Sequence, residues 1–405
     1  MKVTLIPDKC TDCRECSQVL CPEGNVTKTL EEGSCVGCGA CLLLCPEKAL
    51  EFDKNINLQK NNLKLVSVNK KDFSVSGLVK DALNAAGIKT SKFPPENENA
   101  IFMPCCTGGC WSCAVKVDGK YALSCITPLC DDMKIQVLEN PPPIRSVSGF
   151  GAHTVGGVGT PYKLKKMSGP VEAVCFTHGC NLHCPQCQNY KVAFTPSGHL
   201  LESEEAAQIL LGIKEQYQLN RVAISGGEST LNREWLISTI KLIRESDPAV
   251  KIHLDTNGTI ISPDYIDAIV KAGVTDIGVD LKAVRISSFM YITGLEDEKL
   301  AEKYMKTAWN SVRYIADQYR EKIFLGVGIP YNKTLISPEE VEEMGYRIST
   351  IDSDMQVCVL DYRGEFRRKN LIQPSVQEML EIKNILDGTG LKKVIVQTSE
   401  GIMGP

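Results

Sequence analysis

The apolar run Val171-Glu-Ala-Val-Cys-Phe-Thr177 is followed almost at once by Cys180-Asn-Leu-His-Cys184-Pro-Gln-Cys187. The first stretch predicts a buried strand, and the second is a loop with C-x3-C-x2-C spacing. Three thiolates so spaced can hold three irons of a [4Fe–4S] cube, and no fourth cysteine follows at ferredoxin spacing. One iron is then left open, as catalytic metal sites require. We therefore predict that Cys180, Cys184 and Cys187 hold the catalytic cluster.

From Val171 onward, short apolar runs alternate with amphipathic stretches, which indicates the α/β class with a parallel sheet covered by helices. The predicted strands are 171–177, 221–225, 251–256, 276–281, 323–329, 355–360 and 393–397. The predicted helices lie near 203–217, 231–246, 262–272, 299–318, 337–349 and 375–388. Ser262-Pro263 and Ser337-Pro338-Glu339-Glu340 predict N-caps, the second with a capping box. A partial or complete β/α barrel follows, with its active site at the carboxyl ends of the strands.

Length and composition are those of a globular protein of several domains. The 405 residues are 43% hydrophobic and 23% charged, and the net charge of −4 does not indicate a nucleic-acid or membrane partner. The N-terminal MKVTLIPDKC has no apolar signal region, so we expect a cytosolic protein. The 19 cysteines then favour metal sites over disulfides.

The cysteines cluster at residues 10–45, 105–130 and 175–187, separated by the polar stretch Asp53–Lys64 and by Glu139-Asn-Pro-Pro-Pro143. We expect four parts: a 2[4Fe–4S] ferredoxin-like domain (1–64), a [2Fe–2S] domain (65–140), a linker (141–170) and the catalytic domain (171–405). The linker holds the glycine-rich run Gly149–Gly159. A phosphate-binding loop is the alternative there, but the run lacks the Lys-Ser/Thr ending, so we interpret it as a linker or flap.

Eight cysteines form two ferredoxin-type runs, the second matching the bacterial pattern in full. The runs are Cys10-x2-Cys13-x2-Cys16-x4-Cys21-Pro22 and Cys35-x2-Cys38-x2-Cys41-x3-Cys45-Pro46. Because the fourth cysteine of each run reaches the other cube, we expect one [4Fe–4S] cluster on Cys10, Cys13, Cys16 and Cys45 and another on Cys35, Cys38, Cys41 and Cys21. Zinc on four cysteines is the alternative, which two interleaved runs disfavour.

A second block, Cys105-x4-Cys110-x2-Cys113-x11-Cys125, has the spacing of plant-type [2Fe–2S] ferredoxins. Between Cys113 and Cys125 the sequence predicts two strands joined by an Asp-Gly turn, which would bring Cys125 back to the loop. The block resembles the N-terminal [2Fe–2S] domain of succinate dehydrogenase and fumarate reductase iron–sulfur subunits, which implies a β-grasp fold. Cys106 and Cys130 are extra thiols, and Cys106 is an alternative ligand to Cys105.

The C-x3-C-x2-C loop resembles that of the radical S-adenosylmethionine (SAM) superfamily. The resemblance implies that the open iron chelates the amino and carboxylate groups of SAM. One electron then cleaves SAM to methionine and a 5′-deoxyadenosyl radical, which abstracts hydrogen from a substrate. Ser225-Gly226-Gly227-Glu228 is similar to the family's Gly-Gly-Glu, which implies that it binds the SAM amino group.

Two further motifs resemble pyruvate formate-lyase activating enzyme: Asp255-Thr256-Asn257-Gly258 and Gly278-Val279-Asp280-Leu281-Lys282. The resemblance implies that Asp255, Thr256 and Asp280 hold a monovalent cation against the SAM carboxylate. Lys282 contacts SAM or pairs with Asp280. Gln188-Asn189, Tyr291-Ile-Thr-Gly294 and Gly328-Ile-Pro-Tyr-Asn332 also resemble this branch, with loop and packing roles as the alternative.

The remaining candidates are lone residues. His178 and His183 lie around the cluster loop, where His183 is expected to line the site. His153, His199 and His253 are expected to be structural. Cys175 is expected in the core, and Cys358 would act on substrate only if it faces the barrel interior. Arg363, Arg367, Arg368 and Lys369 form a basic patch, either solvated or binding an acidic substrate.

Three functions remain open. The first is an activase that abstracts hydrogen from a glycine of a glycyl-radical enzyme. The second is a radical SAM enzyme acting on a small molecule, another protein or a peptide. The third is an electron-transfer protein regulated by its barrel, which the intact motifs disfavour. The N-terminal clusters would relay electrons from a ferredoxin or flavodoxin, or accept one from a substrate radical. In all we expect three [4Fe–4S] clusters and one [2Fe–2S] cluster, roughly 14 iron atoms per chain.

Overall fold

The computed structural model describes residues 2–19, 21–53, 63–96 and 99–405. The chain divides into two compact units, each taken by itself below. The first contains residues 1–148, 177–181 and 189–202, and the second contains 149–176, 182–188 and 203–405. The break expected at Asp53–Lys64 falls, for residues 54–62, outside the described residues. Among the described helices, none combines the length and apolar character needed to cross a membrane.

The second unit is built on one sheet with the strand order β10-β11-β13-β14-β15-β16-β17-β18-β19. Neighbouring strands from β13 to β18 are parallel, and β19 closes the row antiparallel. The sheet is open: its strand order forms a row and not a closed ring within the described residues, so the barrel is partial. The bounds are β10 (Ile144–His153), β11 (Glu172–Thr177), β13 (Arg221–Gly226), β14 (Lys251–Thr256), β15 (Asp276–Asp280), β16 (Phe324–Tyr331), β17 (Gln356–Asp361), β18 (Lys393–Thr398) and β19 (Gly401–Met403).

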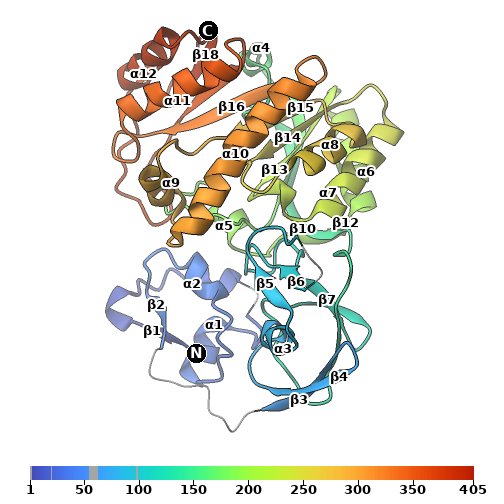
Figure 1. Cartoon of the computed structure of the whole chain (residues 1–405). Helices are drawn as coiled ribbons and strands as arrows, with labels where there is room; N and C mark the ends of the chain where they lie inside the picture. Colours follow the sequence, from blue (N-terminus) through green and yellow to red (C-terminus); the bar gives the residue numbers. More distant parts are fainter. Residues whose placement is uncertain (1, 20, 54–62, 97–98) are drawn as a thin grey trace. The chain divides into compact units, whose positions relative to one another are not determined.

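Helices connect successive strands of this sheet, as Figure 1 shows. They are α6 (Ser203–Gln216), α7 (Arg233–Ser246), α8 (Pro263–Ala272), α9 (Ile286–Thr293), α10 (Glu298–Tyr319), α11 (Pro338–Ile351) and α12 (Val376–Gly388), with short η3 (Ser229–Leu231) and α4 (Tyr162–Lys165). The predicted strands and helices are confirmed to within about two residues, the usual uncertainty of such boundaries. Helix α9 was not expected.

Two expected caps differ from the prediction. The Ser337 hydroxyl does accept from the Glu340 N–H at 3.3 Å, but the capping box is wrong because the Glu340 carboxylate is used elsewhere. It accepts from the backbone N–H groups of Val284 and Arg285 at 3.2 and 2.9 Å. Ser262 caps nothing with its side chain, since its hydroxyl turns to the Asp264 carboxylate.

The prediction of a linker at residues 141–170 is wrong, because most of this stretch is ordered against the sheet. It supplies the ten-residue strand β10, and residues 156–160 then cross the face of the sheet opposite the helices. Gly159 lies so close to Gly278 of β15 that a Cβ on it would be 2.5 Å from the Gly278 nitrogen. A Cβ on Gly326 of β16 would likewise be 2.3 Å from the Val158 carbonyl oxygen. The glycines therefore provide a close backbone contact, which sequence patterns do not distinguish from a flexible run.

The N-terminal part of the first unit is small and built from short elements. Strands β1 (Val3–Leu5) and β2 (Leu50–Phe52) pair antiparallel, and between them lie η1 (Pro7–Lys9), η2 (Glu15–Gln18), α1 (Val26–Glu31) and α2 (Ala40–Leu44). So few apolar side chains are buried here that the core is marginal without further cross-links. Cysteine-bound clusters are one way in which such small folds are stabilised.

The rest of the first unit is centred on a five-stranded mixed sheet, order β4-β3-β9-β7-β8. The bounds are β3 (Lys64–Val68), β4 (Lys71–Val75), β7 (Ala114–Val117), β8 (Lys120–Leu123) and β9 (Lys134–Gln136). Helix α3 (Val79–Ala85) packs on it through Val79, Ala82 and Leu83. The predicted Asp-Gly hairpin is confirmed as β7–β8, with Asp118 and Gly119 both at positive φ. The unit also holds the pair β5 (Lys89–Ser91) and β6 (Ala100–Phe102), helix α5 (Tyr190–Ala193), and β12 (His199–Glu202), which pairs antiparallel with the start of β10.

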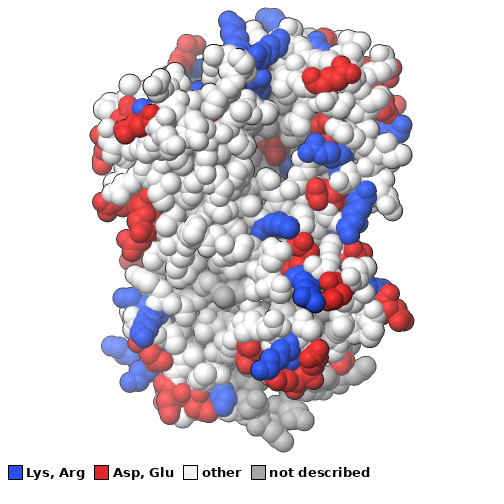
Figure 2. Space-filling model, turned by 180° about the vertical axis from the view of Figure 1, so that it is seen from behind, with Lys and Arg blue, Asp and Glu red and all other residues white. Residues whose placement is uncertain are grey.

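Charged side chains of both signs are interspersed over the face shown in Figure 2. This mixture agrees with the small net charge of −4.

The close contact of Gly159 with the sheet gives a stability prediction. Gly159→Ala should lower the free energy of unfolding by about 1–3 kcal/mol, because the methyl group would have to displace backbone atoms of β15. Gly151→Ala is the matched control, since a Cβ at Gly151 meets no atom within 4 Å. Denaturant unfolding of both variants measures the difference, and equal stabilities would contradict the packing described for residues 156–160.

Candidate active site and cysteine clusters

The cysteine loop after β11 is held in place by elements far away in the sequence. The His183 N–H donates to the Thr293 carbonyl at 2.9 Å, and the Gln186 amide donates to the Ile292 carbonyl at 2.8 Å. A Cβ on Gly294, which has φ +69°, would be 2.5 Å from the His183 carbonyl oxygen. The Tyr291–Gly294 motif thus supports the loop that carries Cys184, and α9, which sequence reasoning missed, provides this support.

Arg368 completes that support. Its guanidinium donates to the Gln186 side chain at 2.7 Å and to the Tyr291 carbonyl at 2.8 Å, and it lies over the Tyr291 ring at 3.9 Å. The backbone N–H groups of Arg367 and Arg368 also donate to the Pro185 carbonyl. The solvated basic patch is therefore wrong for Arg368, whose charge is used in fixing the loop.

Cys184 lies near charged side chains from the carboxyl ends of the strands. Burial raises the pKa of its thiol, and the ammonium of Lys282 opposes this rise. Lys282 donates to Asp280 Oδ2 at 3.0 Å and to the Tyr362 hydroxyl at 3.2 Å. Of the two roles expected for Lys282, the pairing with Asp280 is the one present. Asp280 Oδ1 is buried and has no hydrogen-bond partner among the described residues, as an oxygen waiting for a cation or ligand would be.

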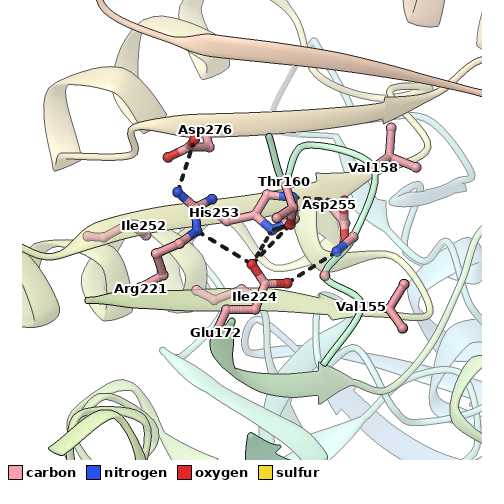
Figure 3. Close-up of polar contacts among 12 residues, drawn as sticks. Val155, Val158, Thr160, Glu172, Arg221, Ile224, Ile252, His253, Asp255 and Asp276 are labelled. Atoms are coloured by element: carbon pink, nitrogen blue, oxygen red, sulfur yellow. Dashed lines mark hydrogen bonds and ion pairs between the residues drawn. The ribbon is translucent and has the colours of Figure 1, made fainter. Parts of the chain in front are cut away.

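Asp255 is oriented by an unexpected buried chain of charges, drawn in Figure 3. His253 donates from Nε2 to Asp255 Oδ1 at 3.0 Å and from Nδ1 to Glu172 Oε2 at 3.2 Å. Because both ring nitrogens face carboxylates, the imidazole is doubly protonated. Burial alone would lower the pKa of His253, but Asp255 and Glu172 raise it to about 10.

Glu172 is the second carboxylate of this buried chain of charges, and it has further polar partners. Thr160 Oγ1 and the Gly157 N–H each donate to its carboxylate at 3.1 Å, and Arg221 Nε lies 3.8 Å away. Burial alone would raise the pKa of Glu172, but His253 and Arg221 lower it to about 2. Glu172 had no sequence signal. His253 had one, because a His-x-Asp spacing on a strand puts both side chains on one face.

Glu228 does not present a free carboxylate, contrary to the pairing expected with the SAM ammonium. Its side chain is 1% exposed and accepts hydrogen bonds from the Thr230 N–H, the hydroxyls of Thr230 and Thr256, and the Asn257 N–H. Four bonds use the acceptor positions of a carboxylate. Glu228 thus fixes the turns after β13 and β14, and the Thr256 hydroxyl is engaged there too.

Four other candidates can be placed from the strand register, the hydrogen bonds and the burial of the side chains. Asp280 of β15 pairs with Gly328 and that in turn with Cys358, so the buried Cys358 faces the same side of the sheet as Asp280. Asn332 donates to the carbonyls of Tyr362 and Ile372, which is a packing role. Cys175 lies in the core as predicted. His178 is a satisfied core histidine, with hydrogen bonds to the Thr195 carbonyl and Ser148 Oγ.

The eight N-terminal cysteines fall into the two expected sets. A cavity of about 340 Å³ is lined by Cys10, Cys13, Cys16 and Cys45, and a narrower one by Cys21, Cys35, Cys38 and Cys41. Burial and the neighbouring thiols of Cys45, Cys13 and Cys10 raise the pKa of Cys16, which shows how close these four lie. The Val3 and Gly37 N–H groups, both 3.4 Å from Cys35 Sγ, would stabilise a thiolate there. Each set can therefore hold a cubane cluster.

The third set forms two pairs of buried sulfurs. Cys105 Sγ lies 3.1 Å from Cys110 Sγ, and Cys113 is hydrogen-bonded to Cys125. Two pairs suit a [2Fe–2S] cluster, in which each iron takes two thiolates. Cys106 is instead 2.7 Å from Lys92 Nζ, and Cys130 is exposed, so neither joins the set. No three His, Cys, Asp or Glu side chains of the described residues converge on a single metal ion.

The buried chain of charges gives a second prediction. Glu172→Gln should lower the free energy of unfolding by about 3 kcal/mol, because it removes the buried charge that lies between two cations. Within the described part of the chain, Arg221 would keep only Asp276 as its counter-ion, and His253 would keep only Asp255. Glu302→Gln, which breaks only the exposed pair with Lys306, should cost less than about 1 kcal/mol. Denaturant titration compares the two, and similar losses would mean that the chain has no stabilising role.

Comparison with known proteins agrees with this geometry. Residues 174–333 match the family model of the Radical SAM superfamily. Two proteins of Methanocaldococcus jannaschii, provisionally named glycyl-radical enzyme activating enzymes, are each 26% identical to the chain. The alignments cover 52% of this chain and 74% of one relative, and 56% of this chain and 90% of the other. The pyruvate formate-lyase-activating enzyme of Streptococcus mutans is 24% identical over 53% of this chain and 81% of that enzyme. The part of the chain that carries the C-x3-C-x2-C loop is therefore similar to the domain that defines the Radical SAM superfamily.

Proposed function

We propose that the chain cleaves SAM reductively at a [4Fe–4S] cluster held by Cys180, Cys184 and Cys187. One electron added to SAM breaks its C5′–S bond and gives methionine and a 5′-deoxyadenosyl radical. The radical then takes a hydrogen atom from the substrate and becomes 5′-deoxyadenosine. The observation that carries this proposal is the C-x3-C-x2-C loop directly after β11, inside the segment that matches the Radical SAM superfamily.

Asp255 and Asp280 would hold a monovalent cation against the SAM carboxylate. Asp280 Oδ1 has no partner within the described residues, and Asp255 is held in orientation by His253. Hard carboxylate oxygens suit such a cation, which offsets the repulsion between anions. Since Glu228 already accepts four hydrogen bonds from the protein, we assign the SAM amino group to backbone carbonyls at Gly226 and Gly227. Thr256 and Glu228 then shape the site without touching SAM.

The remaining twelve ligand cysteines form an electron relay with two [4Fe–4S] clusters and one [2Fe–2S] cluster. The support is that the structure gathers them into sets with the sizes that these clusters need. Fusion to the catalytic domain raises the effective concentration of the electron donor. A ferredoxin or flavodoxin would reduce the relay.

For the substrate we favour a glycine of a glycyl-radical enzyme. The names of the two archaeal relatives and of the streptococcal relative support this class, and the Asp-Thr-Asn-Gly motif is in place. The second candidate is a small molecule or another peptide. It is favoured by Cys358, whose side chain lies on the same face of the sheet as Asp280 and could react with a substrate bound there. A persistent glycyl radical signal in electron paramagnetic resonance (EPR) spectra, seen only with a partner protein present, distinguishes the two.

The proposal is tested first at the cluster loop. Cys184→Ala should abolish 5′-deoxyadenosine formation under dithionite, because a cube left with two thiolates is not retained in the loop. The exposed Cys130, outside every set, is the matched control, and Cys130→Ala should keep the wild-type yield. Chromatography of the deoxyadenosine product measures both. Continued SAM cleavage by Cys184→Ala would refute the assignment of the catalytic cluster.

The cluster inventory is tested by metal content. Anaerobically reconstituted protein should hold roughly 14 iron atoms per chain, in Mössbauer signals of [4Fe–4S] and [2Fe–2S] types. Cys45→Ala should lose only the signal of the set with Cys10, Cys13 and Cys16, although Cys45 belongs to the other run in sequence. Only four irons per chain, or stoichiometric zinc, would be inconsistent with a relay.

A further inference from the structure

The ligand loop of the [2Fe–2S]-type set lies directly against the start of the catalytic cysteine motif, and both segments belong to the first unit. Gly109, between Cys105 and Cys110, contacts the backbone of His178 and Gly179. A Cβ on Gly109 would be 2.9 Å from the Gly179 nitrogen and 2.9 Å from the His178 carbonyl carbon. Real side chains do not come this close to backbone atoms, so the two loops touch only because Gly109 has no side chain.

Gly179 makes the same approach from the other side. A Cβ on Gly179 would be 3.0 Å from the Cys110 nitrogen, 3.1 Å from the Cys110 Cβ and 3.2 Å from the Cys105 Cβ. Gly179 immediately precedes Cys180, the first ligand of the catalytic cluster. One residue therefore separates a ligand of one cluster from two ligands of another.

Hydrogen bonds from the start of β10 and from neighbouring residues fix this contact. The Ser146 N–H donates to the Gly109 carbonyl at 3.4 Å, and the Ser146 carbonyl accepts from the His178 N–H at 2.9 Å. The buried guanidinium of Arg145 donates to the His178 carbonyl at 3.1 Å, and the Gly179 N–H donates to the Val192 carbonyl at 3.0 Å. The start of β10 thus joins the two loops, and their spacing is set by backbone geometry.

We propose that the Gly109–Gly179 contact is the point at which electrons pass from the [2Fe–2S] cluster to the catalytic cluster. The inference rests on the proposed function and names its electron entry. One electron leaves the reduced [2Fe–2S] cluster through the Cys105–Cys110 side and reduces the oxidised [4Fe–4S] cluster at Cys180. A low-potential ferredoxin, through the other clusters, restores the electron. Electron transfer slows steeply as the gap between centres widens, which is why both positions lack side chains.

The contact is tested first in the unaltered protein. In fully reduced wild-type protein, EPR relaxation of the [2Fe–2S] signal should be enhanced by the catalytic cluster. Cys184→Ala, which removes that cluster, should remove the part of the enhancement that the catalytic cluster contributes and leave the part due to the N-terminal clusters. Absence of any magnetic interaction in wild-type protein with all clusters present would overturn the proposal, whatever any variant does.

Gly109→Val then widens the gap. Gly109 is not in the positive-φ region, so the new side chain is resisted by the partner loop and not by its own backbone. The ratio of ferredoxin-driven to dithionite-driven deoxyadenosine formation should fall by roughly an order of magnitude, the scale on which small displacements affect reactions. Gly119→Ala, in the β7–β8 turn with no atom within 4 Å of its Cβ, should keep the wild-type ratio.

The outcomes separate this inference from the proposed function. An unchanged ratio in Gly109→Val, with all clusters assembled, would overturn the contact as the electron route while leaving SAM cleavage standing. Failure of wild-type protein to form deoxyadenosine with dithionite would instead refute the proposed function. If Gly109→Val does not assemble its [2Fe–2S] cluster, Gly109→Ala tests the same contact with a smaller side chain, with the same ratio and EPR relaxation as readouts.

Discussion

The second unit depends on a buried pair of unlike charges, Glu172 and His253, at the start of its sheet. A buried carboxylate is unfavourable unless donors and positive charges surround it. Glu172 accepts hydrogen bonds from Thr160, Gly157 and His253, and the Arg221 guanidinium pairs with it at 3.8 Å. These groups come from the crossing segment and from strands β13 and β14, so one carboxylate ties three elements to β11. His253 then passes the constraint to Asp255 at the carboxyl end of β14. Asp255, which is proposed to hold a cation against the SAM carboxylate, is thereby oriented by side chains that are not themselves proposed to contact SAM.

Glycine has the same function at two distant places, which is to let backbone meet backbone. In the second unit Gly159 meets Gly278, and Gly326 meets Val158, so that residues 156–160 fit against the sheet. In the first unit Gly109 meets Gly179. Both contacts bring a chemically important side chain to its position: Asp255 in one and Cys180 in the other. A glycine-rich run therefore marks a close approach as often as it marks mobility, and only the neighbouring elements decide between the two.

The sequence predicted the regular elements well, because strand and helix signals are local. Apolar runs and caps placed β11 to β18 and their helices within about two residues, and cysteine spacing grouped the N-terminal thiols into the sets that line the two cavities. What it could not supply was contact between distant residues. Nothing local marks Glu172 as the partner of His253, or Arg368 as the residue that fixes the Cys184 loop. The hydrogen bonds that Glu228 accepts were missed for the same reason, because their donors follow two different strands.

The division of the chain passes through the catalytic motif itself. Cys180 belongs to the first unit, and Cys184 and Cys187 belong to the second. Each unit supports its own part of the motif. In the first, Gly179 sets Cys180 next to the loop of Cys105 and Cys110. In the second, the Cys184 loop is fixed by the hydrogen bonds of Gln186 and Arg368. The spacing of the motif is local in sequence, but the positions of its cysteines are decided by residues that no local pattern connects to it.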